Sequence, residues 1–411
     1  MNSKKILILG AGTGGLVAAN ELRRQLPGNH KIAIIERNQS HSLAPSFLWV
    51  MTGERKINQI TCPTSKLLRG GIELVIDQIQ EIDLSQKAVK TAKTKITYDY
   101  LIIAAGAELA FELLPGADLE FQTFYTAEGS ARLHEKLREF RGGKIAIVVM
   151  STPYKCPGAP HEGAMLIADY FRRKRPEIKA DIQLFTPEPQ PMPVAGFELG
   201  AMIKNMLESK GIVYQPQHKV SGISEKKLKF EDGHEFGYDL LVIIPPHRSP
   251  QFVRESDLAN ESGWIPIDKN ILSTKFENVF AIGDVTTISI PGRWKPDVPL
   301  MLPKAGVFAH SQALTVSKRL TNEILGRKSN AQFCGDGFCM LEAGEDLAGF
   351  AYGNFFAEPS PDVRLKKMGR SWHLGKVLFE KWWLSPYGMR RSLLRSAIIY
   401  GGKTLGVPLE L

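Results

Sequence analysis

Two cysteines in this sequence stand in surroundings that suit redox chemistry. Cys156 lies in the turn TPYKCPGAPHEGA, just before an expected helix, and Cys339 lies in the segment GDGFCMLEAGE. The free amides and the dipole of a helix N-terminus stabilise a thiolate, and Lys155 would add to that effect. His161 and Glu162 are close enough in sequence to move protons. We therefore expect a reactive thiol at Cys156.

The other two cysteines, Cys62 and Cys334, match no such pattern and are expected to be structural thiols. Four cysteines in 411 residues are too few for a disulfide scaffold. The chain opens directly on an apolar strand, without a secretory signal, so we expect the cytoplasmic compartment. It has no run of 18 uncharged apolar residues and therefore no expected transmembrane helix. Its length predicts two to three domains, and no metal site is expected.

The elements that must position these groups begin with a nucleotide site. Residues 4–26 predict a strand, a glycine turn and a helix that ends before Pro27-Gly28, and a second strand, Ile32 to Ile35, ends in Glu36. Strand, glycine turn, helix and distal acid form a dinucleotide fingerprint, in which helix amides hold a pyrophosphate and the acid holds a ribose. The expected binding residues here are Gly10, Gly12, Thr13, Gly14, Gly15, Glu36 and Arg37.

Two later segments decide between FAD and NAD. Asp99 to Gly106 (DYLIIAAG) and Asn278 to Val285 (NVFAIGDV) are apolar strands that end in small residues or in Gly-Asp. They resemble the further signatures of the two-dinucleotide-domain flavoproteins, a family that includes glutathione reductase and NADH dehydrogenases. The resemblance implies FAD as the cofactor, with Asp284 holding its ribityl and phosphate part. The residues concerned are Ala105, Gly106, Gly283 and Asp284.

Relatives that use NAD(P)H carry a second glycine fingerprint, and this chain has only its frame. A strand (144–150), a helix (162–173) and a strand (181–185) are expected, but the turn from Ser151 to His161 holds three prolines and one glycine. Prolines remove the amide donors that would bind phosphate, so nicotinamide binding is not expected.

The two cysteine segments together resemble sulfide:quinone oxidoreductases. The stretches around Ala44-Pro45-Ser46 and Leu302-Pro303-Lys304-Ala305-Gly306 match that family as well, and the resemblance runs from Lys4 to about Leu384. It implies that Cys156 and Cys339 form a redox pair above the flavin, with Cys156 against it and a persulfide on Cys339. It further implies FAD contacts at Pro45, Ser46, Lys304 and Gly306, the lysine and the helix N-terminus lying by the pyrimidine edge.

The implied chemistry is attack of hydrosulfide on a disulfide, which leaves a persulfide and a thiolate and sends two electrons to FAD. Two departures from relatives matter. Ala44 stands where sulfide dehydrogenases of the flavocytochrome type attach FAD through a cysteine, and residues 121–130 lack the third cysteine of many bacterial relatives. The first departure predicts non-covalent FAD, and the second leaves the length of the sulfur product open.

The basic charge is concentrated in the tail. The chain carries a net charge of +9, and residues 361–411 hold ten lysines and arginines against three acidic residues. In the stretch WHLGKVLFEKWWL apolar residues recur at helical spacing, and Lys376, Glu380 and Lys381 are expected largely off that face. Residues 390–400 repeat the mixture, which is typical of a helix at a membrane surface. Packing on the core and a dimer contact are the alternatives, and nucleic acid is not expected.

The sequence thus predicts an α/β fold with two Rossmann-like domains. We expect an FAD domain over 1–110 and 245–330, a second domain without the NAD fingerprint over 111–244, and a redox-cysteine and membrane-association region over 331–411. The predicted activity is sulfide oxidation with a membrane quinone as acceptor, with Glu162 assisting. The predicted protein is a peripheral membrane protein on the cytoplasmic side, and the sequence leaves homo-oligomerisation open. Phe338 and Phe379 are candidates to line the quinone path.

Three alternatives remain open at this point: a sulfide dehydrogenase that donates electrons to cytochrome c, a type II NADH dehydrogenase, and a membrane flavoprotein that senses redox state without turnover. The first is opposed by Ala44 and the tail. The second is opposed by the prolines of the second turn, and it would leave the cysteines idle. Steady-state turnover would exclude the third.

Overall fold

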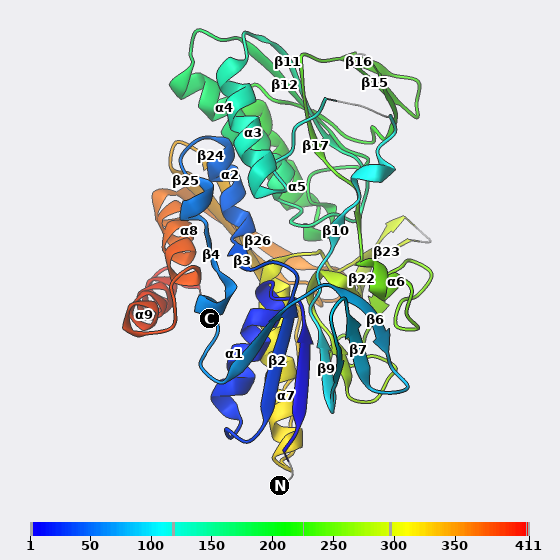
Figure 1. The fold of residues 1–411 in the computed structure, drawn as a ribbon. Coiled ribbons are helices and arrows are strands. Elements are labelled where there is room, and N and C mark those ends of the chain that lie inside the picture. The colour runs from blue at the N-terminus through cyan, green and yellow to red at the C-terminus, as the bar shows by residue number, and fades with distance from the viewer. Residues whose placement is uncertain (1–2, 117–119, 225, 296–297, 408, 410–411) are drawn as a thin grey trace.

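The computed structural model describes residues 3–116, 120–224, 226–295, 298–407 and 409. Its first α/β unit is built on a five-stranded parallel sheet in the order β20-β9-β1-β2-β5. Both faces of this sheet are covered, which explains why its strands are almost wholly apolar. One face packs on two helices and the other on a small antiparallel sheet and a short helix (Figure 1). The elements are β1 (Lys5–Leu9), β2 (Lys31–Glu36), β5 (Ile72–Ile76), β9 (Tyr100–Ile103) and β20 (Val279–Ala281), with α1 (Thr13–Gln25) and α7 (Gly306–Ile324) on one face and β6 (Ile79–Asp83), β7 (Ala88–Thr91), β8 (Lys95–Thr97) and α6 (Gln251–Arg254) on the other.

The second α/β unit has a four-stranded parallel sheet in the order β13-β12-β11-β17. Alternate residues of its central strand separate two cores: Ile145 and Ile147 face three helices, whereas Ala146 and Val148 face an antiparallel sheet. The elements are β11 (Gly143–Val149), β12 (Ala180–Phe185), β13 (Val213–Gln215) and β17 (Leu240–Ile244), the helices α3 (Ala127–Glu139), α4 (Ala159–Lys174) and α5 (Phe197–Ser209), and the strands β14 (Val220–Ser224), β15 (Lys227–Phe230) and β16 (Glu235–Gly237).

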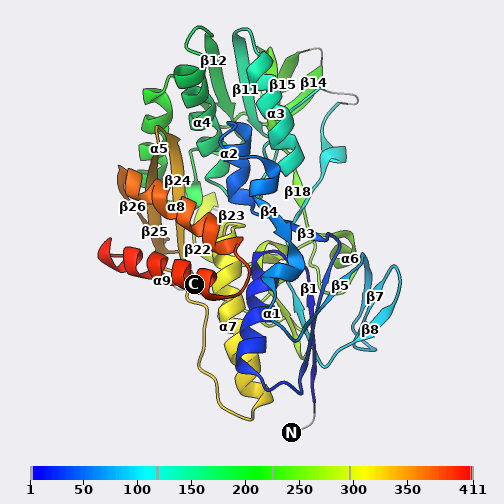
Figure 2. The same cartoon turned by 60° about the vertical axis from the view of Figure 1, so that its left-hand side comes forward.

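A third, antiparallel sheet joins the two units. It consists of β24 (Asp336–Gly344), β25 (Leu347–Asn354) and β26 (Asp362–Gly369), and it lies between the two parallel sheets, beside the tail helices (Figure 2). Leu341 and Ala351 from this sheet are buried in the core of the second unit. Residues far apart in the chain therefore meet where the three sheets converge.

Shorter elements complete the connections. They are β3 (Ser40–Ser42), α2 (Phe47–Met51), β4 (Thr61–Pro63), β10 (Glu108–Leu109), β18 (His247–Arg248), β19 (Ile265–Pro266), β21 (Thr286–Thr287), β22 (Ser289–Lys295) and β23 (Val298–Met301), together with six short 3-10 turns.

The tail forms two helices, α8 (Arg370–Trp383) and α9 (Met389–Thr404), as the apolar spacing predicts. The expected orientation of α8 is wrong. Lys376 and Glu380 are buried rather than on a polar outer face, and Trp382 and Trp383 pack into the core of the first unit. The reason is that oppositely charged partners balance both charges: buried Glu162 pairs with Lys376, and half-buried Arg55 pairs with Glu380.

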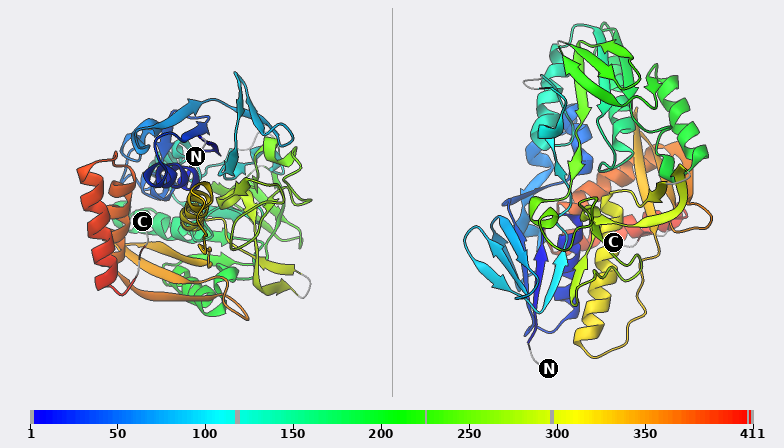
Figure 3. Two further views of the ribbon diagram at one scale, coloured as in Figure 1. Left: turned by 90° about the horizontal axis from the view of Figure 1, so that it is seen from below. Right: turned by 90° about the vertical axis from the view of Figure 1, so that its right-hand side faces the viewer.

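The second tail helix is placed differently. Helix α9 lies along the outside of the molecule, where Figure 3 (left) shows it at the edge. Met389, Leu393 and Tyr400 on this helix are exposed, although all three are large and apolar. Among the described residues, no helix is long and apolar enough to cross a bilayer.

The α/β fold with two parallel sheets confirms the predicted fold class. The residue limits of the three regions stay a prediction. The sheet that carries Cys339 was not predicted as a separate element.

Candidate functional site

A cavity of about 2090 Å³ lies where the three sheets meet. This volume exceeds that of a pocket for one drug-sized molecule, roughly 300–1,000 Å³. Of the predicted site residues, Gly15 and Ser46 do not line it, because Gly15 packs behind the turn and Ser46 is buried and donates to Glu380. The predicted residues that line it are Gly10, Gly12, Thr13, Gly14, Glu36, Arg37, Pro45, Ala105, Gly106, Cys156, Glu162, Gly283, Asp284, Lys304, Gly306, Phe338, Cys339 and Phe379.

The glycine turn after β1 has the geometry of a dinucleotide site. A Cβ on Gly10 would lie 2.6 Å from the carbonyl oxygen of Ala104, and one on Gly15 would lie 1.8 Å from the carbonyl oxygen of Gly10. A Cβ on Gly12 would meet nothing within 4 Å, so this position is open for a ligand. The Gly12 turn leads into α1, whose N-terminus faces that of α7, since Gly306 lies beside Thr13. Two converging helix N-termini suit an anionic cofactor.

Glu36 and Asp284 supply the acidic groups expected of an FAD site. The Glu36 carboxylate accepts hydrogen bonds from the amides of Ala11 (2.8 Å) and Asn38 (3.0 Å), which fixes it at the end of β2. The Oδ1 atom of Asp284 is buried without a partner. Burial raises the pKa of Asp284, while Lys155 and Lys304 oppose this rise. A buried orphan carboxylate oxygen on the cavity fits the hydroxyls of a bound cofactor.

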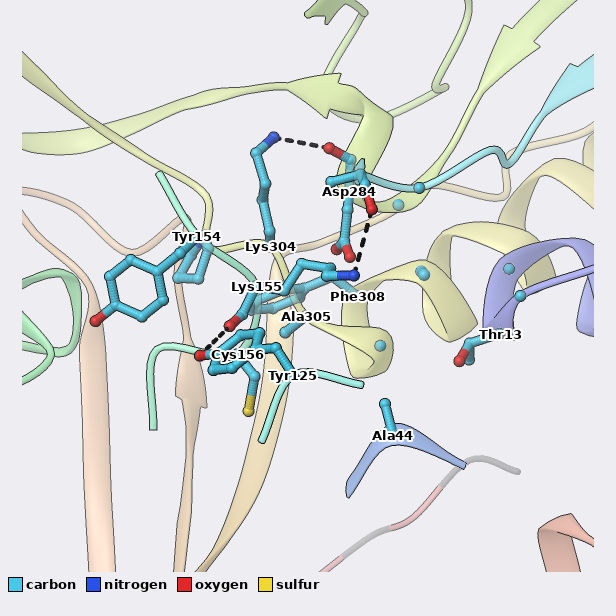
Figure 4. Close-up of a pocket in the computed structure, with 18 of the residues that line it drawn as sticks. Thr13, Ala44, Tyr125, Tyr154, Lys155, Cys156, Asp284, Lys304, Ala305 and Phe308 are labelled. Atoms are coloured by element: carbon cyan, nitrogen blue, oxygen red, sulfur yellow. Dashed lines mark hydrogen bonds between the residues drawn. The ribbon is translucent and has the colours of Figure 1, made fainter. Parts of the chain in front are cut away.

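Lys304 connects the first unit to the cysteine turn. Its Nζ donates to the carbonyl oxygen of Asp284 at 2.7 Å (Figure 4). It also donates to the carbonyl oxygen of Thr286 at 3.1 Å and lies 3.4 Å from the ring centre of Trp264. Burial lowers the pKa of Lys304 to about 8. The side chain is buried, so the lysine is not a loose surface charge.

The turn before α4 carries Cys156 in a constrained conformation. Cys156 has φ +56°, and its amide donates a 2.7 Å hydrogen bond to the carbonyl oxygen of Lys304. Next to it, the hydroxyl of Tyr125 donates to the carbonyl oxygen of Lys155 at 3.0 Å, and Lys155 Nζ donates to the carbonyl oxygen of Ala107 (Figure 4). The cysteine turn is thus bound to the first unit through its main chain.

Cys339 reaches the same place from β24. A Cβ on Gly158 would lie 3.7 Å from the Sγ of Cys339 and 3.7 Å from the Oε2 of Glu162, so thiol and carboxylate both lie beside this glycine. The charges of Cys156 and Glu162 both act on the Cys339 thiol. The two cysteines and Glu162, brought together only by the fold, therefore form one cluster.

The expected low pKa of Cys156 is wrong for this structure. Burial raises the pKa of Cys156 to about 12, and burial also raises the pKa of Cys339 well above the ordinary value. Both residues face the cavity and are partly accessible, but their thiols lie deep in the protein. The cation that counteracts the rise at both thiols is Lys376 of α8, not Lys155. Desolvation dominates because the turn is covered by the other units.

A family profile described as pyridine nucleotide-disulphide oxidoreductase matches residues 4–305, which include the glycine turn, the Cys156 turn and Asp284. The chain belongs to this family. Members of this family bind FAD, and the open glycine turn, Glu36 and the orphan oxygen of Asp284 fit it.

Sulfide:quinone oxidoreductases are similar to this chain over most of its length. The chain is 27% identical over 398 residues to the sulfide-quinone reductase of Aquifex aeolicus, covering 93% of this chain and 90% of that protein. It is 26% identical over 302 residues to the mitochondrial sulfide:quinone oxidoreductase of Mus musculus, covering 70% of this chain and 66% of that protein. The X-ray structure of the Aquifex aeolicus sulfide:quinone oxidoreductase superposes with a TM-score of 0.80 at 25% identity, covering 92% of this chain and 90% of that one.

The sequence did not predict several residues of the oxidoreductase site. Lys376 was placed on an outer face, and the buried pair of Tyr154 and Glu188 was not considered. The sequence did contain a signal for Glu188. This acid comes shortly after β12 of the second unit, much as Glu36 ends β2 of the first unit. Lys376 had no such signal, since its partner Glu162 is brought to it by tertiary packing alone.

Proposed function

We propose that this oxidoreductase oxidises sulfide to sulfane sulfur with the Cys156–Cys339 pair and passes two electrons through bound FAD to a membrane quinone. One observation carries the proposal: two cysteines from distant segments meet on the cavity that also holds the FAD-binding elements. The balance is HS⁻ + quinone + H⁺ → S⁰ + quinol. FAD, when bound, supplies the two-electron acceptor beside the thiols.

The cysteines perform the sulfur chemistry. Hydrosulfide attacks the disulfide form of the pair, the S–S bond breaks, and a persulfide forms on one cysteine while the other leaves as a thiolate. The persulfide is assigned to Cys339 and the thiolate to Cys156. Since burial disfavours this anion, the buried ammonium of Lys376 is the group that stabilises it. Glu162, held by Lys376, keeps that charge in place.

The acceptor side is assigned to two aromatic residues. Phe338 stacks on Phe350 with ring centres 5.5 Å apart, and Phe379 stacks on Trp383 at 5.9 Å. Phe338 and Phe379 both line the cavity. Rings that are already held in place bind a flat quinone at a low entropic cost, and we assign the quinone site to these two.

Helix α9 is the proposed membrane contact. Met389, Leu393 and Tyr400 recur at helical spacing on its exposed side, and Arg390 and Lys403 are exposed on the same helix. Apolar side chains flanked by basic ones suit the headgroup region of an anionic membrane. The protein would lie on the cytoplasmic side, where quinone arrives from the bilayer.

The test is an anaerobic assay with sulfide and a short-chain quinone, which follows quinone reduction and the flavin spectrum together. We expect turnover that NADH does not support, that Cys156→Ser or Cys339→Ser abolishes, and that the matched Cys334→Ser and Cys62→Ser variants retain. Bleaching of the flavin by NADH but not by sulfide would replace the proposal with an NADH dehydrogenase. Reduction of cytochrome c without quinone reduction would change the acceptor.

A further inference from the structure

A second carboxylate faces the cavity from the other α/β unit. Glu188 is 5% exposed, lines the cavity and follows β12. Its Oε2 accepts hydrogen bonds from the hydroxyls of Tyr154 (2.7 Å) and Thr186 (3.1 Å). Tyr154 is only two residues before Cys156, so this carboxylate is tied to the cysteine turn.

The position of Glu188 corresponds to that of a ribose-binding acid in a dinucleotide site. In the first unit Glu36 has this place, and its carboxylate is held by two backbone amides. In the second unit the hydroxyl of Tyr154 reaches the carboxylate of Glu188 instead. The carboxylate of Glu188 is thus tied through Tyr154 to the turn that carries Cys156, and it lines the same cavity as both cysteines.

The described titratable groups around Glu188 include Tyr125, Tyr154, Tyr214 and His161. Within this cluster, Glu188 is the group that exchanges a proton near neutral pH. Burial raises the pKa of Glu188 to about 7, against the two hydroxyl hydrogen bonds. Burial also raises the pKa values of Tyr125, Tyr154 and Tyr214, so their hydroxyls stay protonated. Burial lowers the pKa of His161, whose ring lies 6.0 Å from that of Tyr214, to about 4.

The two glutamates of the cavity differ in their partners. Glu162 accepts from the ammonium of Lys376 at 2.7 Å and from the amide of Glu342 at 2.9 Å. The described partners of the Glu188 side chain are hydroxyl groups only. Two carboxylates in unlike surroundings suit two tasks. Glu162 pairs with the ammonium of Lys376, whereas the described partners of the Glu188 carboxylate are uncharged hydroxyls.

The residues near Glu188 in the sequence that line the cavity include the apolar Pro187, Met192, Pro193 and Val194. Moving an anion past apolar residues costs more than moving a neutral molecule. Hydrogen sulfide ionises near neutral pH and is present in both forms. The neutral form therefore passes these residues more easily, but the chemistry at the cysteines needs the anion, so a base is required inside the cavity.

We infer that Glu188 is the base that removes a proton from neutral hydrogen sulfide inside the cavity, oriented by Tyr154. The inference rests on the proposed function. The steps are H₂S + Glu188-COO⁻ → HS⁻ + Glu188-COOH, followed by HS⁻ + Cys–S–S–Cys → Cys–S–SH + Cys–S⁻. One S–H bond and the S–S bond break, and one S–S bond and one O–H bond form. The disulfide is reduced and the sulfide sulfur is oxidised.

The test follows reduction of bound FAD by sulfide in a stopped-flow instrument across pH, with wild type and Glu188→Gln in the same buffers. We expect Glu188→Gln to be slower by about 10²-fold below and near neutral pH. The deficit should shrink at alkaline pH, where sulfide arrives already as hydrosulfide. Reoxidation of the reduced protein by quinone should be unchanged. Exposed Glu198→Gln is the matched control.

A second variant separates the base from a structural part. The hydrogen bond from Tyr154 lowers the pKa of Glu188. Tyr154→Phe should therefore move the midpoint of the pH profile upward, with flavin content and unfolding midpoint kept. Equal rates for Glu188→Gln and wild type near neutral pH would overturn the inference. So would a deficit that is constant with pH and shared by quinone reoxidation. If sulfide did not bleach the flavin of the wild type at all, the proposed function itself would be refuted.

Discussion

The Nζ of Lys376 lies 2.7 Å from the Oε1 of Glu162, although 214 positions separate the two residues in the chain. Both side chains are almost wholly buried. This pair fastens tail helix α8 to helix α4 of the second unit, next to both cysteines. The pair supports the fold, and its two charges act on both thiols in opposite directions: Lys376 lowers their pKa values and Glu162 raises them.

Breaking this pair should destabilise the protein strongly. Lys376→Met leaves a buried carboxylate without its cation, and we expect a loss of about 3–5 kcal/mol in the free energy of unfolding. Urea denaturation measures it. Lys381→Met, on the exposed side of the same helix, is the control, and adding Glu162→Gln to Lys376→Met should restore most of the loss. A loss no larger than that of the control would show that the pair does not hold the tail.

The glycines of the first turn should separate folding from cofactor binding. Gly12→Ala has open space for its methyl group and should fold as wild type but lose FAD, because the methyl group occupies the position of the ligand. Gly15→Ala meets the carbonyl oxygen of Gly10 and should lower the stability by about 1–3 kcal/mol or more. The ratio of flavin to protein and the unfolding of the FAD-free chains measure both. Full flavin content in Gly12→Ala would contradict the assigned site.

The four thiols should differ in reactivity when reduced. At neutral pH, iodoacetamide should modify exposed Cys334 first, because thiolates react and the pKa values of Cys156 and Cys339 are raised by burial. Peptide mass spectrometry over time gives the order. Lys376→Gln should slow Cys339 further, since Lys376 lowers the pKa of that thiol. Faster modification of Cys156 than of Cys334 would restore the activated thiol that the sequence predicted.

His373 should make the free energy of unfolding depend on pH. Its Nδ1 lies 3.0 Å from an oxygen of Glu342, and this hydrogen bond holds the pKa of His373 above its ordinary value. The stabilisation is fully present below the unfolded pKa, about 6.5, and is lost as pH rises through the folded pKa. Urea unfolding at several pH values should show that wild type and His234→Gln are more stable than His373→Gln at low pH, and that this difference shrinks as pH rises through the folded pKa of His373. A difference that does not change with pH would contradict the assignment.

The outer face of α9 should bind membranes. Leu393→Glu combined with Tyr400→Glu should lower the affinity for anionic vesicles, measured by co-sedimentation, by at least about tenfold. Burial of each exposed apolar side chain contributes roughly 1.5–3 kcal/mol to binding. Turnover with a water-soluble quinone should not change. Leu113→Glu, an exposed apolar residue away from the tail, is the control. Unchanged vesicle binding together with a lower mass in light scattering would assign the face to a homo-oligomer contact.

Local sequence patterns predicted the helices and strands better than they predicted the burial and the partners of individual side chains. The strand, turn and helix around Gly10 and the helices α4, α7, α8 and α9 follow from spacing and composition, which are properties of neighbouring residues. The charge state of Cys156 could not follow, because its desolvation depends on sheets that fold over it. Lys376 and Glu380 look like surface charges until Glu162 and Arg55 are known to be their partners. The position of Glu188 on the cavity could not be predicted from the sequence, because it depends on how the second sheet is placed.

The placement of Cys339 on β24 also sets an order of events during translation. The glycine turn, Cys156, Asp284 and α7 all precede β24 in the chain, and domains generally fold as they leave the ribosome. A nascent chain that has not yet reached β24 carries the glycine turn and Asp284, but it has only one of the two thiols, no ammonium beside Glu162, and not yet Trp382 and Trp383 of the first unit's core. The proposed sulfur chemistry can begin only when β24 and α8 have been synthesised and docked. About the last fifth of the chain, from β24 onward, therefore has to be made before the proposed reaction can start.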